Sequence, residues 1–229
     1  MDSLPTEVSR DILSRCSEYV PVLQETCYEW NQTLSDKSVA KVALSFEQMA
    51  ERDHIDLLER IERNKIGVKR IHNILLHGAK KGHLRVMHLA KKWGADNYDD
   101  ALITAAANGQ IPAMHVLKEW GATDYYWSLN SATMNGQIPA MHLLRKWGAT
   151  NYDNALVSAV TNGQIPAMHL LREWGATSYN FTLAIAAMLG QIPAMRLLKE
   201  WGATDYDHAL SYASHRVDVV ELLNSWINQ

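Results

Sequence analysis

Apolar and small residues recur along this chain at helical spacing, in pairs of short segments. One representative second segment carries its apolar side chains at Ile138, Met141, Leu143, Leu144 and Trp147. At 100° per residue, these positions cover about 220° of a helical wheel. One neighbour cannot bury a stripe that wide. The pattern therefore predicts a helix packed on two sides, inside a stack whose units bury one another's faces.

The pattern repeats along the chain with a fixed period. A Trp-Gly-Ala triplet marks each copy, and its tryptophans are Trp93, Trp120, Trp147, Trp174 and Trp201. Neighbouring tryptophans in this series are 27 positions apart, and a typical unit is NYDNALVSAVTNGQIPAMHLLREWGAT. Self-similarity at such a period is typical of solenoids. Within the first clear copy we predict one helix from about 99 to 108 and a second over 111–120, with Gly109 between them.

Start and stop signals agree with this period. Asp99, Asp153 and Asp207 are candidate N-caps of the first helices. A proline falls near the first turn of the second helices, where its missing N–H costs nothing, at Pro112, Pro139, Pro166 and Pro193. The glycine after each tryptophan suits a left-handed C-cap. Alanines on the first helices, such as Ala105 and Ala106, permit close helix approach.

Fainter copies extend the array at both ends. One begins near Phe46 and another covers 75–95, while the last, over 210–229, lacks the Gly-Gln connection. Terminal units present one face to water, so such divergence is expected. We predict about seven helix-turn-helix units, at 39–67, 68–94, 95–121, 122–148, 149–175, 176–202 and 203–229.

The unit resembles the ankyrin repeat, most closely at Ala101-Leu102, Ala105-Ala106, Gly109 and Gly121-Ala122. Ankyrin units have about 33 residues and begin with a β-turn, whereas these have 27 and lack the Thr-Pro-Leu-His opening. The missing residues fall where the projecting hairpin would lie. We therefore expect an all-α solenoid without β-hairpin fingers over 39–229. The resemblance implies protein binding and no particular chemistry, so we expect no enzyme and no cofactor.

The N-terminus resembles an F-box over about 2–34. The matching segments are LPTEV from Leu4, Ile12-Leu13, Val22-Leu23 and TCYEWN from Thr26. The resemblance implies a small helical bundle over 1–38 that docks on a Skp-type adaptor of a cullin-RING ubiquitin ligase. The candidate adaptor contacts are Leu4, Pro5, Ile12, Leu13 and Val22. Large DNA viruses carry many such F-box and ankyrin combinations. The alternative is that this amphipathic segment only caps the first repeat.

Composition narrows the partners. The formal net charge is −3, and Lys and Arg are interspersed with Glu and Asp along the chain, so we expect no nucleic-acid partner. No apolar run approaches the roughly 20 residues of a membrane span. Cys16 and Cys27 have no metal-ligand spacing and suit reduced core thiols. We expect a cytoplasmic protein, in the host cytoplasm if viral, with the nucleus also open.

One histidine column invites a metal or catalytic interpretation. It comprises His88, His115, His142 and His169. Stacked helices lie about 8–10 Å apart, whereas two nitrogens sharing a zinc ion lie within roughly 4 Å of each other. We therefore predict a solvated face rather than a site, and the sequence contains no triad order, phosphate loop or HExxH motif. The tryptophan column is interpreted as packing between units, although it could also form a shared ridge.

Binding residues are sought where the copies differ, because framework positions repeat. The most variable columns lie along the first helix, and the candidate partner-binding residues in them are Tyr126, Trp127, Asn154, Phe181 and His208. The three aromatics replace small polar residues of sister copies and are typical interface anchors. The alternative is that they fill gaps between units.

Two functions follow from these features. The chain is either a substrate receptor of a Skp/cullin-type ubiquitin ligase, or a structural or sequestering scaffold, such as a virion component, with no ligase link.

Overall fold

The structure, a computed structural model, describes Leu58 and residues 67–213 and 216–228. The F-box-like segment with its candidate adaptor contacts, and nearly all of the first predicted unit, lie outside these residues. Every regular element within them is a helix. The chain divides into two compact parts, 1–101 and 102–229, and each is described by itself.

In the first part, α7 (Val68–Lys81) and α8 (Leu84–Lys92) form an antiparallel pair. Ile71, Ile74 and Leu75 are buried on α7. Gly78 allows the close approach of α8, because a Cβ atom there would lie 3.0 Å from the Met87 side chain. After α8 the chain turns at Trp93, which is also buried, into α9 (Tyr98–Ala107), which runs on into the second part.

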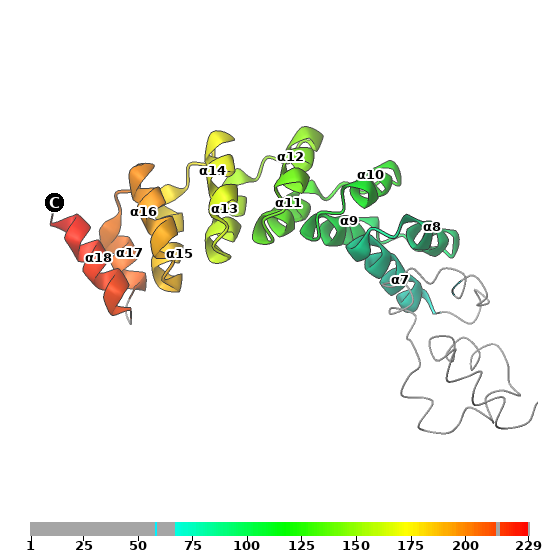
Figure 1. The fold of residues 1–229 in the computed structure, drawn as a ribbon, viewed down its shortest axis with the longest axis horizontal. Helices are drawn as coiled ribbons and strands as arrows, with labels where there is room; N and C mark the ends of the chain where they lie inside the picture. Colours follow the sequence, from blue (N-terminus) through cyan, green and yellow to red (C-terminus); the bar gives the residue numbers. More distant parts are fainter. Residues whose placement is uncertain (1–57, 59–66, 214–215, 229) are drawn as a thin grey trace, which may run out of the picture. The chain divides into compact units, whose positions relative to one another are not determined.

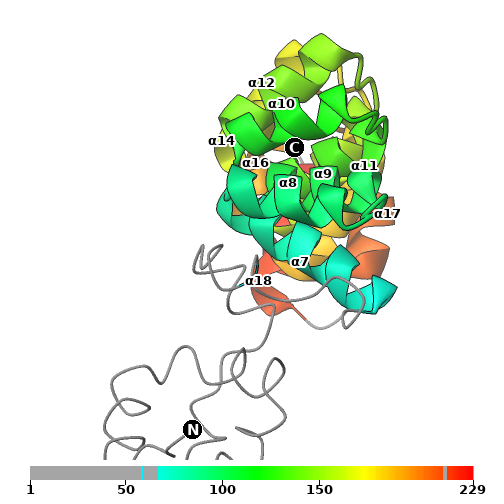
Figure 2. The same ribbon diagram turned by 90° about the vertical axis from the view of Figure 1, so that its right-hand side faces the viewer.

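The second part contains alternating first and second helices. The first helices are α11 (Tyr125–Met134), α13 (Tyr152–Thr161), α15 (Tyr179–Leu189) and α17 (Tyr206–Tyr212). The second helices are α10 (Ile111–Glu119), α12 (Ile138–Trp147), α14 (Ile165–Glu173), α16 (Ile192–Glu200) and α18 (Val217–Ile227). Each first helix packs against the next first helix, so α11, α13, α15 and α17 form one row. The second helices α12, α14 and α16 form another row beside it (Figures 1 and 2). This is the predicted all-α solenoid.

The start and stop signals of the second helices are confirmed. Each of α10, α12, α14 and α16 carries its proline in the first turn. The glycine after the tryptophan has a positive φ, as at Gly148, where φ is 107°. The core between the rows is formed by alanines of the first helices and by Met141 and Leu144 and their equivalents, all fully buried. The small alanine side chains of the first helices let the longer Met and Leu side chains of the second helices pack closely against them.

The predicted N-caps of the first helices are wrong. Each first helix begins at a tyrosine, so Asp99, Asp153 and Asp207 lie inside the first turn, one residue after its start. The residue before the tyrosine is the N-cap instead. Asp124 and Asp205 occupy this position, and each accepts a hydrogen bond from the backbone N–H three residues later. Asp153 is thereby left to contact the following unit.

Candidate functional site

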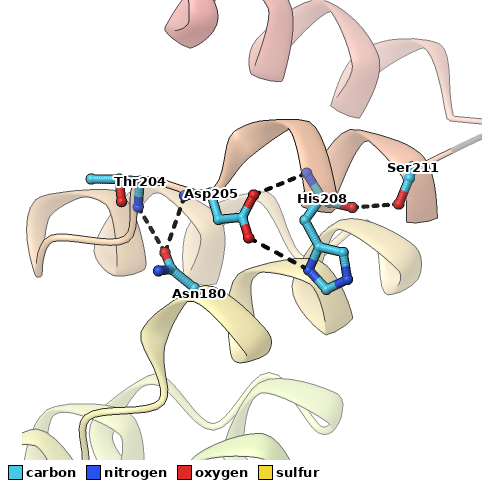
Figure 3. Close-up of polar contacts among 5 residues, drawn as sticks. All are labelled: Asn180, Thr204, Asp205, His208 and Ser211. Atoms are coloured by element: carbon cyan, nitrogen blue, oxygen red, sulfur yellow. Dashed lines mark hydrogen bonds and ion pairs between the residues drawn. The ribbon is translucent and has the colours of Figure 1, made fainter.

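Asp153 joins its unit to the next one. Its Oδ1 atom accepts hydrogen bonds from the backbone N–H groups of Thr177 and Ser178, at 2.7 and 2.8 Å. Asn180 occupies the same position one unit later, and its Oδ1 accepts from Thr204 and Asp205 at 2.8 and 3.1 Å (Figure 3). An oxygen at the second position of a first helix thus satisfies two turn donors of the next unit.

The charge of Asp153 responds to this contact. Burial alone would raise the pKa of its carboxyl group. The hydrogen bonds from Thr177 and Ser178 favour the carboxylate more strongly, and together they hold the pKa of Asp153 below its usual value of 3.8. Because Asn180 makes the same contact without a charge, the charge of Asp153 is not required by the joint.

Tyr126 replaces the oxygen-bearing residue at this position in α11. The joint is then formed in the opposite direction, because Asn151 of the next unit donates to the backbone carbonyl of Tyr126 at 3.1 Å and to Asn130 Oδ1 at 3.0 Å. The Tyr126 hydroxyl also accepts from Asn154 Nδ2. Tyr126 therefore has a structural role in the stack, although the residue is 41% exposed.

Trp127 and Phe181 point mostly into solvent. They occupy equivalent positions on α11 and α15 and are 58% and 55% exposed. The alternative that they fill gaps between units therefore does not describe them, although Trp127 has an edge contact with Tyr126 at 5.1 Å. Asn154 takes the same position on α13 and His208 on α17, and both are exposed.

His208 is held against α17. Its backbone N–H donates to Asp205 Oδ1 at 3.2 Å, and its Nδ1 lies 4.0 Å from Asp205 Oδ2 (Figure 3). The imidazole also contacts the edge of the Tyr212 ring at 5.2 Å. Ser211 donates from its hydroxyl to the carbonyl of His208. These contacts fix the orientation of the His208 side chain on α17, the last helix of the row.

Two methionines extend the exposed aromatics into ridges, and sequence comparison between copies had not singled them out. Met134 and Met188 follow Trp127 and Phe181 by seven positions, which places each pair on the same helical face. Both methionines are 44% exposed. The intervening helix α13 carries Asn154 and Thr161 at these two positions. The row therefore has an apolar ridge on α11, a polar strip on α13 and an apolar ridge on α15.

The two rows of the second part differ in charge. Over residues 122–228, every lysine and arginine lies on a second helix or at its N-cap, namely Arg145, Lys146, Arg172, Arg196, Lys199 and Arg216. The first helices and the turns before them contain Asp124, Asp153, Asp205 and Asp207 and no lysine or arginine. The surface with the exposed aromatic residues is therefore acidic.

The histidine column has a structural role that the prediction of a solvated face missed. His142 lies edge-on to Trp174 of the next unit at 5.4 Å, and Arg145 lies over the same ring at 4.9 Å. The contacts recur at His169, Arg172 and Trp201. The imidazoles are exposed, but each helps to hold the next tryptophan. The interpretation of the tryptophans as packing between units agrees with this geometry.

No metal centre is found in the described residues, where no three His, Cys, Asp or Glu side chains come close enough to share an ion. None of the helices seen there has the length and apolar character needed to cross a membrane.

Comparison with known proteins gives the fold. No family model and no curated protein matches this sequence. Among solved structures, the chain is similar to the human ASB11 ankyrin repeat domain, with a TM-score of 0.60 and 19% sequence identity. The match covers 79% of this chain and 96% of that one. The helical array therefore has the fold of an ankyrin-repeat solenoid.

Proposed function

We propose that this ankyrin-repeat array binds a protein along its first helices, and that the chain is a substrate receptor linking that protein to a Skp/cullin-type ubiquitin ligase. The observation that supports binding is the exposure of Trp127 and Phe181. Both large aromatic side chains are more than half exposed. Such side chains are common anchors of protein interfaces.

The ligase link is supported by sequence alone. The resemblance of residues 2–34 to an F-box assigns the adaptor contacts to Leu4, Pro5, Ile12, Leu13 and Val22. In this arrangement the N-terminal segment recruits the adaptor and the repeats choose the substrate. We expect such a receptor to act in the cytoplasm. The competing function is a structural or sequestering scaffold in which the N-terminal segment is only a cap.

An affinity pull-down read by mass spectrometry tests both halves of the proposal. The full chain is compared with Leu4→Ala/Pro5→Ala and with Trp127→Asn/Phe181→Asn. Asparagine is the residue that the array itself carries at the equivalent Asn154, so the second variant preserves the fold. Ile227→Ala, which removes an apolar side chain that is 41% exposed on a second helix, is the matched control.

A receptor loses its Skp-type adaptor and cullin with the first variant and its substrate with the second, while the control loses neither. A scaffold recovers no adaptor with any variant, yet still loses its partner with Trp127→Asn/Phe181→Asn. If that variant retains every partner of the native chain, binding does not occur on the first helices.

A further inference from the structure

We propose that the first-helix surface of the second part recognises a basic amphipathic polypeptide segment. The surface is defined by the exposed residues of α11, α13, α15 and α17 and of the turns before them. This inference rests on the proposed function and adds the chemistry of the partner.

The sign of the partner's charge follows from the charge of the surface. Asp153, Asp205 and Asp207 are exposed and Asp124 is half-buried, and these helices and turns contain no lysine or arginine. The basic side chains of residues 122–201 are on the second helices, where Arg145, Arg172 and Lys199 lie over tryptophan rings. A cationic segment is therefore attracted to the first-helix row. An acidic segment or a nucleic acid is repelled by it.

The apolar part of the partner follows from the two ridges. Trp127 with Met134, and Phe181 with Met188, stand on helices separated by α13. At 8–10 Å per helix spacing, the ridges are about 16–20 Å apart. An extended peptide rises about 3.3 Å per residue, and side chains an even number of residues apart share a face, so apolar side chains about six residues apart reach both ridges.

The polar strip between the ridges accommodates the backbone of such a segment. Asn154 and Thr161 are exposed there, and Ser158 is half-buried. Their side chains are shorter than those of the ridges and include amide and hydroxyl groups. Aromatic rings beside carboxylates also suit lysine and arginine, whose stems pack on the ring while the charge contacts the carboxylate. The surface thus fits a peptide with two apolar anchors and basic residues around them.

Selection of peptides tests the inference. A phage-displayed library of random 12-residue peptides is selected on the immobilised full chain, after depletion on Trp127→Asn/Phe181→Asn. Twelve extended residues span about 40 Å, enough to cover both ridges. We expect the recovered peptides to have a positive net charge and apolar residues about six positions apart.

One recovered peptide is then synthesised with a fluorophore, and its Kd is measured by anisotropy. Asp153→Asn/Asp207→Asn removes two charges from the surface, and Asn180 shows that asparagine is tolerated at this position. Glu173→Gln/Glu200→Gln removes two charges from the exposed second helices and is the matched control. We expect a several-fold weaker Kd for the first pair, little change for the control, and a further loss in high salt for the native chain.

Peptides that are neutral or acidic, or a Kd equally affected by both charge variants, would overturn the basic partner while leaving a protein-binding first-helix surface intact. The inference would also be overturned if no peptide were recovered, or if every recovered peptide bound Trp127→Asn/Phe181→Asn as tightly as the native chain. The proposed function fails separately, when the pull-down from cell lysate shows no partner that depends on these two residues.

Discussion

At the scale of single residues, the second position of each first helix decides how a unit is joined to the next. Asp153 and Asn180 accept two backbone hydrogen bonds from the following turn, whereas Tyr126 accepts one on its own backbone carbonyl from Asn151. The same place in the repeat thus supports two kinds of joint. The distinction between charge and geometry at this position can be measured.

Asp153→Ala is expected to lower the free energy of unfolding by about 1 kcal/mol, because two turn N–H groups lose their acceptor at a solvent-exposed site. Asp153→Asn is expected to stay within about 0.5 kcal/mol of the native chain, because it reproduces the Asn180 joint. Urea unfolding followed by circular dichroism measures both. Equal destabilisation by the two variants would show that the charge, and not the acceptor geometry, stabilises the joint.

The lowered pKa of Asp153 predicts a dependence of stability on pH. Because the folded-state pKa lies below the usual 3.8, the charge stabilises the folded state above pH about 4. This contribution is lost as the pH falls through the folded pKa. At so exposed a group it amounts to a few tenths of a kcal/mol. The difference in unfolding free energy between the native chain and Asp153→Asn, measured from pH 7 to pH 2.5, should therefore be constant above pH 4 and shrink below it.

The residue-scale contacts were the least predictable from the sequence. An aspartate followed by small apolar residues is typical of an N-cap, and nothing in that local pattern indicates acceptance of hydrogen bonds 24 residues further on. The contact between His142 and Trp174 could not be predicted either. Both residues recur every 27 positions, and this shared period does not indicate which histidine meets which tryptophan. Trp127 and Phe181, by contrast, could be identified from the sequence, because they are large aromatic residues at a position where a sister copy has the small polar Asn154.

At the scale of helices, a glutamine column joins the connections between first and second helices. Gln164 donates from Nε2 to the carbonyl of Met134 in the preceding unit at 3.1 Å. In the last unit Arg216 replaces the glutamine and donates from Nε to the carbonyl of Met188 at 3.2 Å. The last unit therefore keeps this joint although its sequence lacks the Gly-Gln pair.

Gly136→Ala and Gly163→Ala separate the strain of the backbone from the glutamine contact. Both glycines have a φ near 65°, but a Cβ atom at Gly136 would lie 2.5 Å from Gln164 Oε1, whereas at Gly163 the nearest glutamine oxygen is 3.6 Å away. We expect both changes to cost about 1 kcal/mol for the left-handed conformation. Gly136→Ala should cost about 1 kcal/mol more, because Gln164 must leave its hydrogen bond.

Thermal unfolding of the two variants and of Gly136→Ala/Gln164→Ala measures the difference. In the double variant the alanine at 136 has no glutamine side chain to clash with. The loss of stability that this alanine causes should therefore equal the loss caused by Gly163→Ala. An unchanged effect would show that the backbone conformation alone requires glycine at this position.

Helix positions, by contrast, followed closely from the sequence. Prolines, glycines and the apolar stripe predicted the second helix of the first clear copy to within one residue, over 111–120, where the helix is Ile111–Glu119. Local signals were sufficient because proline and left-handed glycine restrict the backbone directly. The glutamine joint was not predicted, because an exposed-looking polar residue gives no sign of a partner in the preceding unit.

At the scale of the whole molecule, stability in the described second part comes from contacts between neighbouring units. Trp174 is 8% exposed and packs on His142 and Arg145 of the unit before it. Such arrays behave approximately as a sum of unit terms and nearest-neighbour terms. A change at one joint should therefore act locally.

Trp174→Ala is expected to lower stability by about 3 kcal/mol, as for other buried tryptophans. Its effect should be concentrated in α12, α13 and α14, where amide hydrogen exchange measured by mass spectrometry should become faster. Exchange in α10 should change little. Equal acceleration throughout 102–228 would show that this part unfolds as a single cooperative block instead.

The reversed joint at Tyr126 also restricts how the gene could gain or lose repeats by recombination. In-frame loss of 176–202 would place Asp153 opposite Thr204 and Asp205, whose backbone donors already meet an equivalent acceptor. Loss of 149–175 would instead place Tyr126 opposite Ser178, which has no amide with which to replace Asn151. Unit 149–175 thus could not be lost while 122–148 is kept, whereas unit 176–202 could be lost by itself.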